Sequence, residues 1–107
     1  MEPGEPTLRQ LQYLAALDEV PHFRRAAERL GVSQPTLSAQ IQALEEALGL
    51  HLVERSRSGV ALTPLGREVV AKARPVLAGA REIVDFAREG RMGLAGPPDA
   101  NQIGSLQ

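Results

Sequence analysis

The chain of 107 residues contains no cysteine, no tryptophan, two histidines and only three aromatic residues. Without cysteine it can form no disulfide and no thiolate metal site. His22 and His51 belong to no cluster with the spacing of metal ligands, and neither a glycine-rich phosphate loop nor a nucleophile elbow occurs. We therefore predict no metal site, no cofactor, no small-molecule site and no enzymatic activity.

Long apolar runs and a strong net charge are also lacking. No segment approaches the length of a membrane span and no signal peptide precedes Thr7, so we expect a cytoplasmic protein without a membrane partner. The net charge of −1 is unevenly distributed, because residues 22–75 hold eight basic against five acidic residues. The middle of the chain is therefore mildly basic, and its contacts with a polyanion should weaken readily with salt.

Two apolar stripes separated by a glycine predict two short helices joined by a tight turn. The first stripe has the helical spacing i, i+3, i+4, i+7 and ends before Gly31, which suits a left-handed helix end. Ser33 can cap the next helix and Pro35 fits its first turn. The first stripe consists of Phe23, Ala26, Ala27 and Leu30, and the second of Leu37, Ile41, Leu44 and Leu48. The spacing alone fits a DNA-binding helix-turn-helix and a plain corner of two helices equally.

The exposed side of the second helix favours DNA. It is small and uncharged, whereas an ordinary solvated helix face carries Glu and Lys pairs. Hydroxyl and amide groups can meet base edges in a major groove, and the Pro35 ring and Thr36 methyl suit a thymine methyl. Glu45 and Glu46 lie in the C-terminal half, so we expect the N-terminal turn to face the DNA.

The segment after Gly49 predicts a β-hairpin, which we call the wing. Leu52, Val60 and Leu62 can cover the base of the helices, and Ser58-Gly59 supplies the turn. Arg55 and Arg57 would then lie on or near the tip. Such arginines can be merely solvated, but beside a helix-turn-helix they are better explained as contacts to phosphates or to a minor groove.

A long helix is predicted from Thr63-Pro64 to about Ala87, bent but not broken at Pro75. Its apolar residues repeat every four and three positions, the pattern of a coiled-coil seam. We predict that this seam pairs two chains in a homodimer; the alternative is a helix that folds back on its own domain. The seam consists of Val69, Ala73, Val76, Ala80, Ile83 and Ala87.

A further helix is predicted near the N-terminus, where Thr7 and Gln10 form a capping box. It runs to about Leu17, with Leu8, Leu11, Leu14 and Leu17 available to the core. The predicted fold is mainly α, a winged helix-turn-helix followed by a dimerisation helix. Its parts are a flexible N-terminus (1–6), the winged helix-turn-helix domain (7–63), the linker helix (64–89) and a flexible tail (90–107).

The chain resembles the N-terminal half of the LysR-type transcriptional regulators. The resemblance covers about residues 8–87. The segments that carry it are Leu8-Arg-Gln-Leu11, Arg25-Ala-Ala-Glu-Arg-Leu30, Val32-Ser-Gln-Pro-Thr-Leu-Ser38, Gln40-Ile41, Leu44-Glu45, Leu48-Gly49, Leu52-Val-Glu-Arg55 and Leu62-Thr63 with Gly66. It implies sequence-specific binding of double-stranded DNA by a dimer, and therefore association with the bacterial nucleoid. It also implies base contacts by Gln34, Pro35, Thr36, Ser38 and Gln42, and phosphate contacts by Arg25, Arg55 and Arg57.

The sequence departs from that family at several positions. Ala39 replaces a long side chain, so we expect no base contact there, and His22 replaces a frequent serine cap. His22 can face a phosphate or remain an exposed, weakly capping residue. Regulators of this family carry an effector domain after the linker helix, and we expect this chain to lack it, as a fragment, a short relative or a truncated product.

A second function from a different class is a winged helix used for protein contact. In that case the seam would pair with a full-length regulator and titrate it into inactive heterodimers. Gln34, Pro35 and Thr36 argue against it, because an interaction-only domain needs no side chains suited to base edges.

Overall fold

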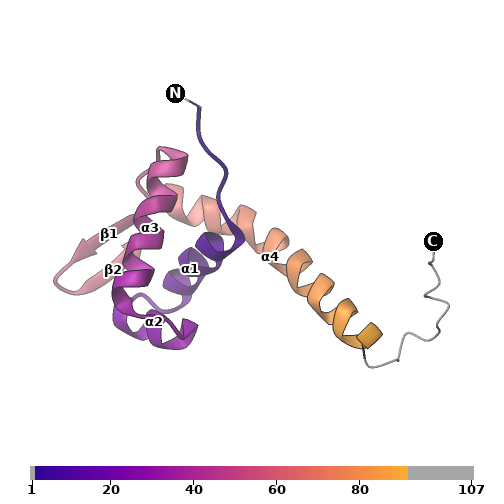
Figure 1. Ribbon diagram of the computed structural model, residues 1–107. Coiled ribbons are helices and arrows are strands. Elements are labelled where there is room, and N and C mark those ends of the chain that lie inside the picture. Colours follow the sequence, from indigo (N-terminus) through magenta and orange to yellow (C-terminus); the bar gives the residue numbers. More distant parts are fainter. Residues whose placement is uncertain (1, 92–107) are drawn as a thin grey trace. The chain divides into compact units, whose positions relative to one another are not determined.

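The computed structural model describes residues 2–91, and within this range four helices and one hairpin follow each other in the predicted order (Figure 1). The elements are α1 (Leu8–Glu19), α2 (Phe23–Leu30), α3 (Gln34–Leu48), β1 (Val53–Ser56), β2 (Gly59–Leu62) and α4 (Pro64–Arg91). The mainly helical winged fold is therefore confirmed. Most of the tail predicted for 90–107 lies outside the described residues. None of the described helices is both long and apolar enough to cross a membrane.

The helix ends are set by the residues that the sequence placed there. Thr7 and Gln10 form the predicted capping box of α1, and the Ser33 side chain accepts a hydrogen bond from the Thr36 N–H at 3.2 Å. Gly31 and Gly49 end α2 and α3 with φ of 75° and 68°, a left-handed conformation that costs glycine little. These local signals separate α2 from α3 by a three-residue turn.

One hydrophobic core joins α1, α2, α3, the wing and the first turns of α4. Its largest fully buried side chains are Leu14, Leu17, Leu37, Ile41, Leu44 and Leu52. The prediction that Leu8 contributes to this core is wrong, because its side chain is 49% exposed. Leu8 is the first residue of α1, and helical side chains point toward the N-terminus, here past the end of the core.

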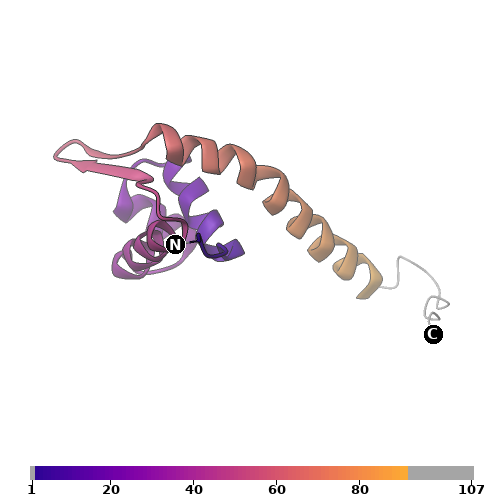
Figure 2. The same ribbon diagram turned by 90° about the horizontal axis from the view of Figure 1, so that it is seen from above.

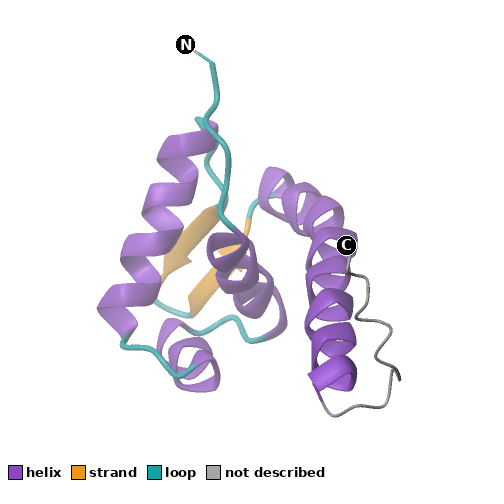
Figure 3. Cartoon of the chain, turned by 45° about the vertical axis from the view of Figure 1, so that its right-hand side comes forward, coloured by secondary structure: helices purple, strands orange, loops and turns teal. Residues whose placement is uncertain are grey.

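The wing is an antiparallel pair in which Val53 lies opposite Leu62 and Ser56 opposite Gly59. Arg57 and Ser58 therefore form the two-residue turn, and the prediction that Ser58-Gly59 forms it is wrong by one residue. Gly59 instead begins β2 with φ of 133°, a value that side chains rarely allow. Figures 2 and 3 show this hairpin as the only sheet among the described residues, and Figure 2 shows its tip extending away from the helices of the N-terminal unit.

The start of α4 is tied to the chain that precedes the wing. Thr63 Oγ1 accepts a hydrogen bond from the Gly66 N–H at 3.0 Å and donates one to the His51 carbonyl at 2.7 Å. Val70 and Ala73 continue the contact by burying their side chains in the core region. As predicted, α4 continues through Pro75 without a break. Tertiary contacts divide the chain after Leu77, so the first half of α4 belongs to the N-terminal unit.

Candidate nucleic-acid interface

The outward side of α3 carries the side chains that the sequence singled out for base contacts. Gln34, Pro35, Thr36 and Gln42 are exposed, and Ser38 is half-buried beside the wing. Ala39 lies exposed among them and shortens the side-chain layer at the centre of this face. Such a face offers amide and hydroxyl groups above a surface flat enough to approach base edges. We call these five polar or proline residues the α3 face.

The first turn of α3 has its hydroxyl groups already oriented. Ser33 Oγ caps the helix and donates a hydrogen bond to Thr36 Oγ1 at 2.9 Å. A hydroxyl has one hydrogen and two acceptor positions, so Thr36 keeps its hydrogen for an outside acceptor. Thymine O4 or a purine N7 offers an acceptor of this kind in the major groove.

Arg55 lies near the wing tip, as predicted, but within β1, where it pairs with Val60 one position before the last strand pair. Its guanidinium lies over the Phe23 ring, 4.3 Å from the ring centre, and its Nη2 donates a hydrogen bond to Ser38 Oγ at 3.0 Å. One side chain therefore connects the wing with both α2 and α3. The packing of Phe23 against the core supplies the flat surface on which the guanidinium rests.

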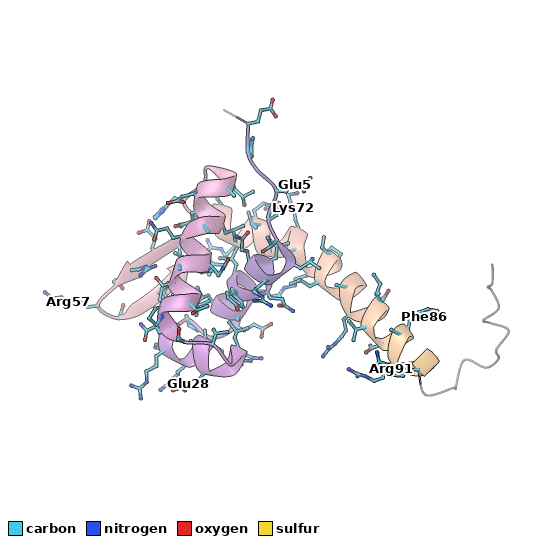
Figure 4. All side chains as sticks on the ribbon, viewed as in Figure 1. Glu5, Glu28, Arg57, Lys72, Phe86 and Arg91 are labelled. Atoms are coloured by element: carbon cyan, nitrogen blue, oxygen red, sulfur yellow. The ribbon has the colours of Figure 1, made fainter. Side chains whose placement is uncertain are left out.

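Arg57 is the arginine at the tip. It occupies the turn between the two strands and points away from α2 and α3 (Figure 4). No ion pair involves Arg57 within residues 2–91. A guanidinium without a carboxylate partner at the end of a hairpin can reach a phosphate or enter a groove.

The N-terminal turn of α2 adds a second set of cations. Arg24 and Arg25 are both exposed, and together with His22 and Glu28 they line a shallow hollow. Arg24 Nε lies 3.7 Å from Glu28 Oε2, an exposed pair that contributes little to stability. His22 precedes the helix, and its side chain makes no capping hydrogen bond. The expected weakly capping, exposed histidine is confirmed in its geometry.

A second hollow lies between the start of α2, the wing and the start of α3, and we call it the notch. Its cationic groups are Arg24 and Arg55, and Gln34 of the α3 face forms part of its wall. No Asp or Glu lines it. The lining consists of His22, Phe23, Arg24, Gln34, Arg55, Ser56, Gly59 and Val60. Sequence reasoning missed the notch because its residues come from three separate segments.

The two acids of α3 differ in what they do. Glu46 is exposed and its Oε2 lies 3.5 Å from Gln42 Nε2. Glu45 is half-buried, and its Oε2 accepts hydrogen bonds from the Leu52 N–H at 2.8 Å and the Val53 N–H at 3.2 Å. Glu45 thus holds the beginning of the wing against α3, a role that the sequence did not predict. Among residues 2–91 no three His, Asp or Glu side chains are placed to share a metal ion.

The seam residues of α4 fall into two groups. Ala73 is buried in the chain's own core region and Val69 packs against that core, as the fold-back alternative expects for this stretch. Val76 is 49% exposed and Ile83 is 70% exposed. The C-terminal turns of α4 also expose Phe86, which the seam does not include (Figure 4). The candidate dimer interface therefore begins at Val76 and continues through Ala80, Ile83 and Ala87.

Comparison with protein families and curated proteins gives a consistent result. Residues 8–67 match the family described as bacterial regulatory helix-turn-helix protein, lysR family. The HTH-type transcriptional regulator EstR of Acinetobacter baylyi is 54% identical over 84 residues, which cover 78% of this chain and 28% of that protein. IlvR of Caulobacter vibrioides, also an HTH-type transcriptional regulator, is 47% identical over 83% of this chain and 30% of its own length. The chain thus spans less than a third of these relatives.

Solved structures with the same fold include DNA complexes. The DNA-binding domain of BenM bound to its catB site 1 DNA superposes with a TM-score of 0.74 and 36% identity, covering 86% of this chain and 99% of that one. The CbnR DNA-binding domain in complex with DNA gives a TM-score of 0.71 and 41% identity over 79% of this chain and 98% of that one. Oxidised OxyR of Corynebacterium glutamicum matches with a TM-score of 0.79 and 39% identity, and 27% of its chain is covered.

Proposed function

The chain belongs to the LysR family of bacterial regulatory helix-turn-helix proteins, and from this premise we propose that two copies bind an inverted repeat in double-stranded DNA and regulate transcription. The α3 face, exposed, uncharged and turned outward, is the observation that carries this proposal. We propose that the chain acts in the cytoplasm, at the bacterial nucleoid, because the DNA that such a regulator would bind lies there.

Base contacts are assigned to the α3 face. Gln34, Thr36, Ser38 and Gln42 supply amide and hydroxyl groups for base edges, and Pro35 supplies an apolar contact. The N-terminal turn of α3 approaches the DNA first, because the free N–H groups at this end of the helix favour a negative partner. Both acids of α3 lie in its C-terminal half, away from this approach.

Backbone contacts are assigned to Arg25, Arg55 and Arg57. They come from α2, the body of the wing and its tip, so they flank α3 and set its orientation in the groove. With about three phosphate contacts per chain, a dimer should show a slope of roughly −5 in a plot of log affinity against log salt concentration.

Pairing is assigned to the seam from Val76 to Ala87, with the flanking Val69 and Ala73 supporting the helix from within the chain. Within residues 2–91 the side chains of Val76 and Ile83 remain exposed, and a two-fold partner helix is the simplest way to cover them. The two α3 helices would then lie about 34 Å apart, in successive major grooves on one side of the duplex.

The alternative, a domain that only titrates other regulators, finds no support among the relatives. The BenM and CbnR domains were solved with DNA, and this chain shares their fold over nearly the whole of each domain. Base-contact chemistry on α3 would have no purpose in a domain that binds protein alone.

Selection of bound duplexes from a random DNA pool, with the purified chain at near-physiological salt, tests the proposal. Recovery of an inverted repeat with one fixed half-site spacing is the expected result. Recovery of a single half-site would contradict dimeric binding, and an unchanged pool would contradict sequence-specific binding by this chain.

A further inference from the structure

We propose that the notch holds one backbone phosphate of the bound DNA between Arg24 and Arg55, and that Phe23 and Ser38 act as positioning residues for Arg55. This inference rests on the proposed DNA binding. It adds Arg24 and Phe23 to the residues involved, and it reassigns Ser38 from a base contact to the positioning of Arg55. The observation that carries it is the position of the Arg55 guanidinium. It extends from β1, lies over the Phe23 ring of α2 and donates a hydrogen bond to the Ser38 hydroxyl of α3.

The charge and shape of the notch suit a phosphodiester. Its two arginines come from two different elements, α2 and β1, and no carboxylate of residues 2–91 belongs to the lining. A phosphate oxygen has room for several donors, and arginine presents its N–H groups as a planar fork that matches this geometry. His22 adds a polar ring without a capping bond of its own, and the first-turn N–H groups of α2 receive no side-chain cap from it.

Arg55 is held in place before DNA arrives. Its Nη2 donates one hydrogen bond to Ser38, and the plane of the guanidinium lies over Phe23. The other N–H groups of the guanidinium remain for an outside acceptor. A long side chain that is already ordered loses less conformational freedom on binding than a free one. Among residues 2–91, Arg57 at the wing tip forms no ion pair and lies over no aromatic ring. The two wing arginines should therefore contribute differently, although their charges are equal.

Arg24 is available to share the same phosphate. Within residues 2–91 its only ion pair joins Nε to Glu28 Oε2 at 3.7 Å, and the two side chains are 83% and 67% exposed. Such a pair yields readily to a stronger anion. Gln34 also belongs to the notch wall, so a phosphate held there lies beside the residue that begins the α3 face. The bound phosphate would thereby set the register of Gln34 against the bases.

Neutralising single phosphates identifies the contact. A duplex carrying the preferred site, or any duplex that the chain binds, is prepared with one methylphosphonate at a time, and affinity is measured by fluorescence anisotropy. For the wild-type chain, a methylphosphonate at the phosphate held in the notch should weaken binding about tenfold, as expected for loss of a charged hydrogen bond. Arg24→Gln and Arg55→Gln should each weaken binding to the unmodified duplex and lose part of their sensitivity at that same position, and the double variant should lose all of it. Arg57→Gln is the matched control and should lose its sensitivity at a different position.

The positioning roles have their own readout. Ser38→Ala and Phe23→Leu should weaken binding to the preferred site and to a random duplex alike, by about 3- to 10-fold. In these variants the Arg55 side chain becomes ordered only when DNA binds, and the loss of its conformational freedom then lowers the affinity. Arg55→Lys keeps the charge but loses the fork and should fall between the wild type and Arg55→Gln. Thermal unfolding of each variant, measured alongside, separates these losses from misfolding.

The outcomes are distinguishable. Arg24 and Arg55 variants that lose sensitivity to two different phosphates, or to none, overturn the shared phosphate while leaving DNA binding intact. A Ser38→Ala loss confined to the preferred site overturns its positioning role and makes it a base contact. A wild-type chain that binds no duplex at all overturns both this inference and the proposed function.

Discussion

A β-carbon at Gly66 would collide with the carbonyl oxygen of Leu52, which lies against the first turn of α4. The contact exists because Thr63 caps α4 and at the same time bonds the His51 carbonyl, which draws the helix onto the chain before the wing. At the residue scale, single atoms of this kind decide whether the elements can meet. The same scale governs DNA contacts, where one amide or one guanidinium faces one acceptor.

Gly66→Ala should lower the free energy of unfolding by about 2–3 kcal/mol, since a rigid backbone atom blocks the added methyl group. Chemical denaturation measures this. Gly79→Ala in the same helix is the control, because a β-carbon there meets no atom within 4 Å and alanine has the higher helix propensity. Equal stability of the two variants would contradict the close approach of α4 to Leu52.

Gln34→Ala should weaken binding to the preferred site by about 1–3 kcal/mol and affect a random duplex much less, because the lost hydrogen bonds concern base edges. Competition binding against both duplexes measures the difference. Gln12→Ala, an exposed glutamine on α1, should leave both affinities unchanged. Equal losses of Gln34→Ala on the two duplexes would remove Gln34 from the base contacts.

At the scale of elements, the wing is held by contacts from outside the hairpin. Glu45 of α3 accepts hydrogen bonds from the N–H groups of Leu52 and Val53, where the wing begins. The Val60 N–H donates to the Pro21 carbonyl at 3.4 Å. A two-stranded hairpin is at best marginally stable by itself. Its orientation beside α3 therefore depends on these anchors and on the buried side chains at its base.

Glu45→Gln should lower the free energy of unfolding by about 1–2 kcal/mol, because a charged acceptor of two backbone N–H groups becomes a neutral one. Glu46→Gln is the control at the adjacent position. The exposed carboxylate of Glu46 lies 3.5 Å from Gln42 Nε2 and accepts no backbone hydrogen bond within residues 2–91. Denaturant titration distinguishes them, and two variants of equal stability would show that the Glu45 bonds are replaced by water.

Arg57→Ala should weaken binding to the preferred and the random duplex alike and reduce the salt slope by about one per chain, the signature of a lost phosphate contact. The slope is obtained from affinities at several salt concentrations. Arg9→Ala removes the same charge from the first turn of α1 and should leave the slope unchanged. An unchanged slope for Arg57→Ala would mean that the wing tip stays in solution.

At the scale of the whole molecule, the part of the chain that the structure describes leaves several apolar side chains of α4 exposed. The core of the N-terminal unit already buries Ala73 and covers Val69, so this unit does not depend on a partner for its own packing. Three of these exposed side chains are Val76, Ile83 and Phe86. A second copy of the chain packed against α4 would remove their apolar surface from water. We therefore assign the proposed dimerisation to α4 and the proposed DNA contact to the N-terminal unit.

Ile83→Asp should abolish dimers at micromolar concentration, because an unpaired carboxylate in a helix pair costs several kcal/mol. Sedimentation equilibrium gives the mass directly. Arg81→Asp places the same charge on the far side of the helix and should preserve dimers. A dimeric Ile83→Asp chain would show that copies pair through another surface.

The sequence by itself determined the features that depend on neighbours along the chain. Thr7, Ser33, Gly31 and Gly49 mark helix ends because capping bonds and left-handed glycines act within a few residues, and the structure confirms each of them. Apolar periodicity likewise predicted the buried stripes of α2 and α3, since a helix presents every third or fourth residue to one side. Fold class and element order followed from these local rules.

Only the tertiary structure decided which distant side chains meet. Arg55 lies over Phe23 and bonds Ser38 because three elements converge there, and Glu45 bonds a segment seven and eight residues further along. Periodicity could not tell that Ala73 packs into its own domain, because one spacing suits an inner core and a partner helix equally. The notch also depends on contacts between distant segments. Packing of α2, α3 and the wing brings its walls together, and a local sequence pattern does not encode that packing.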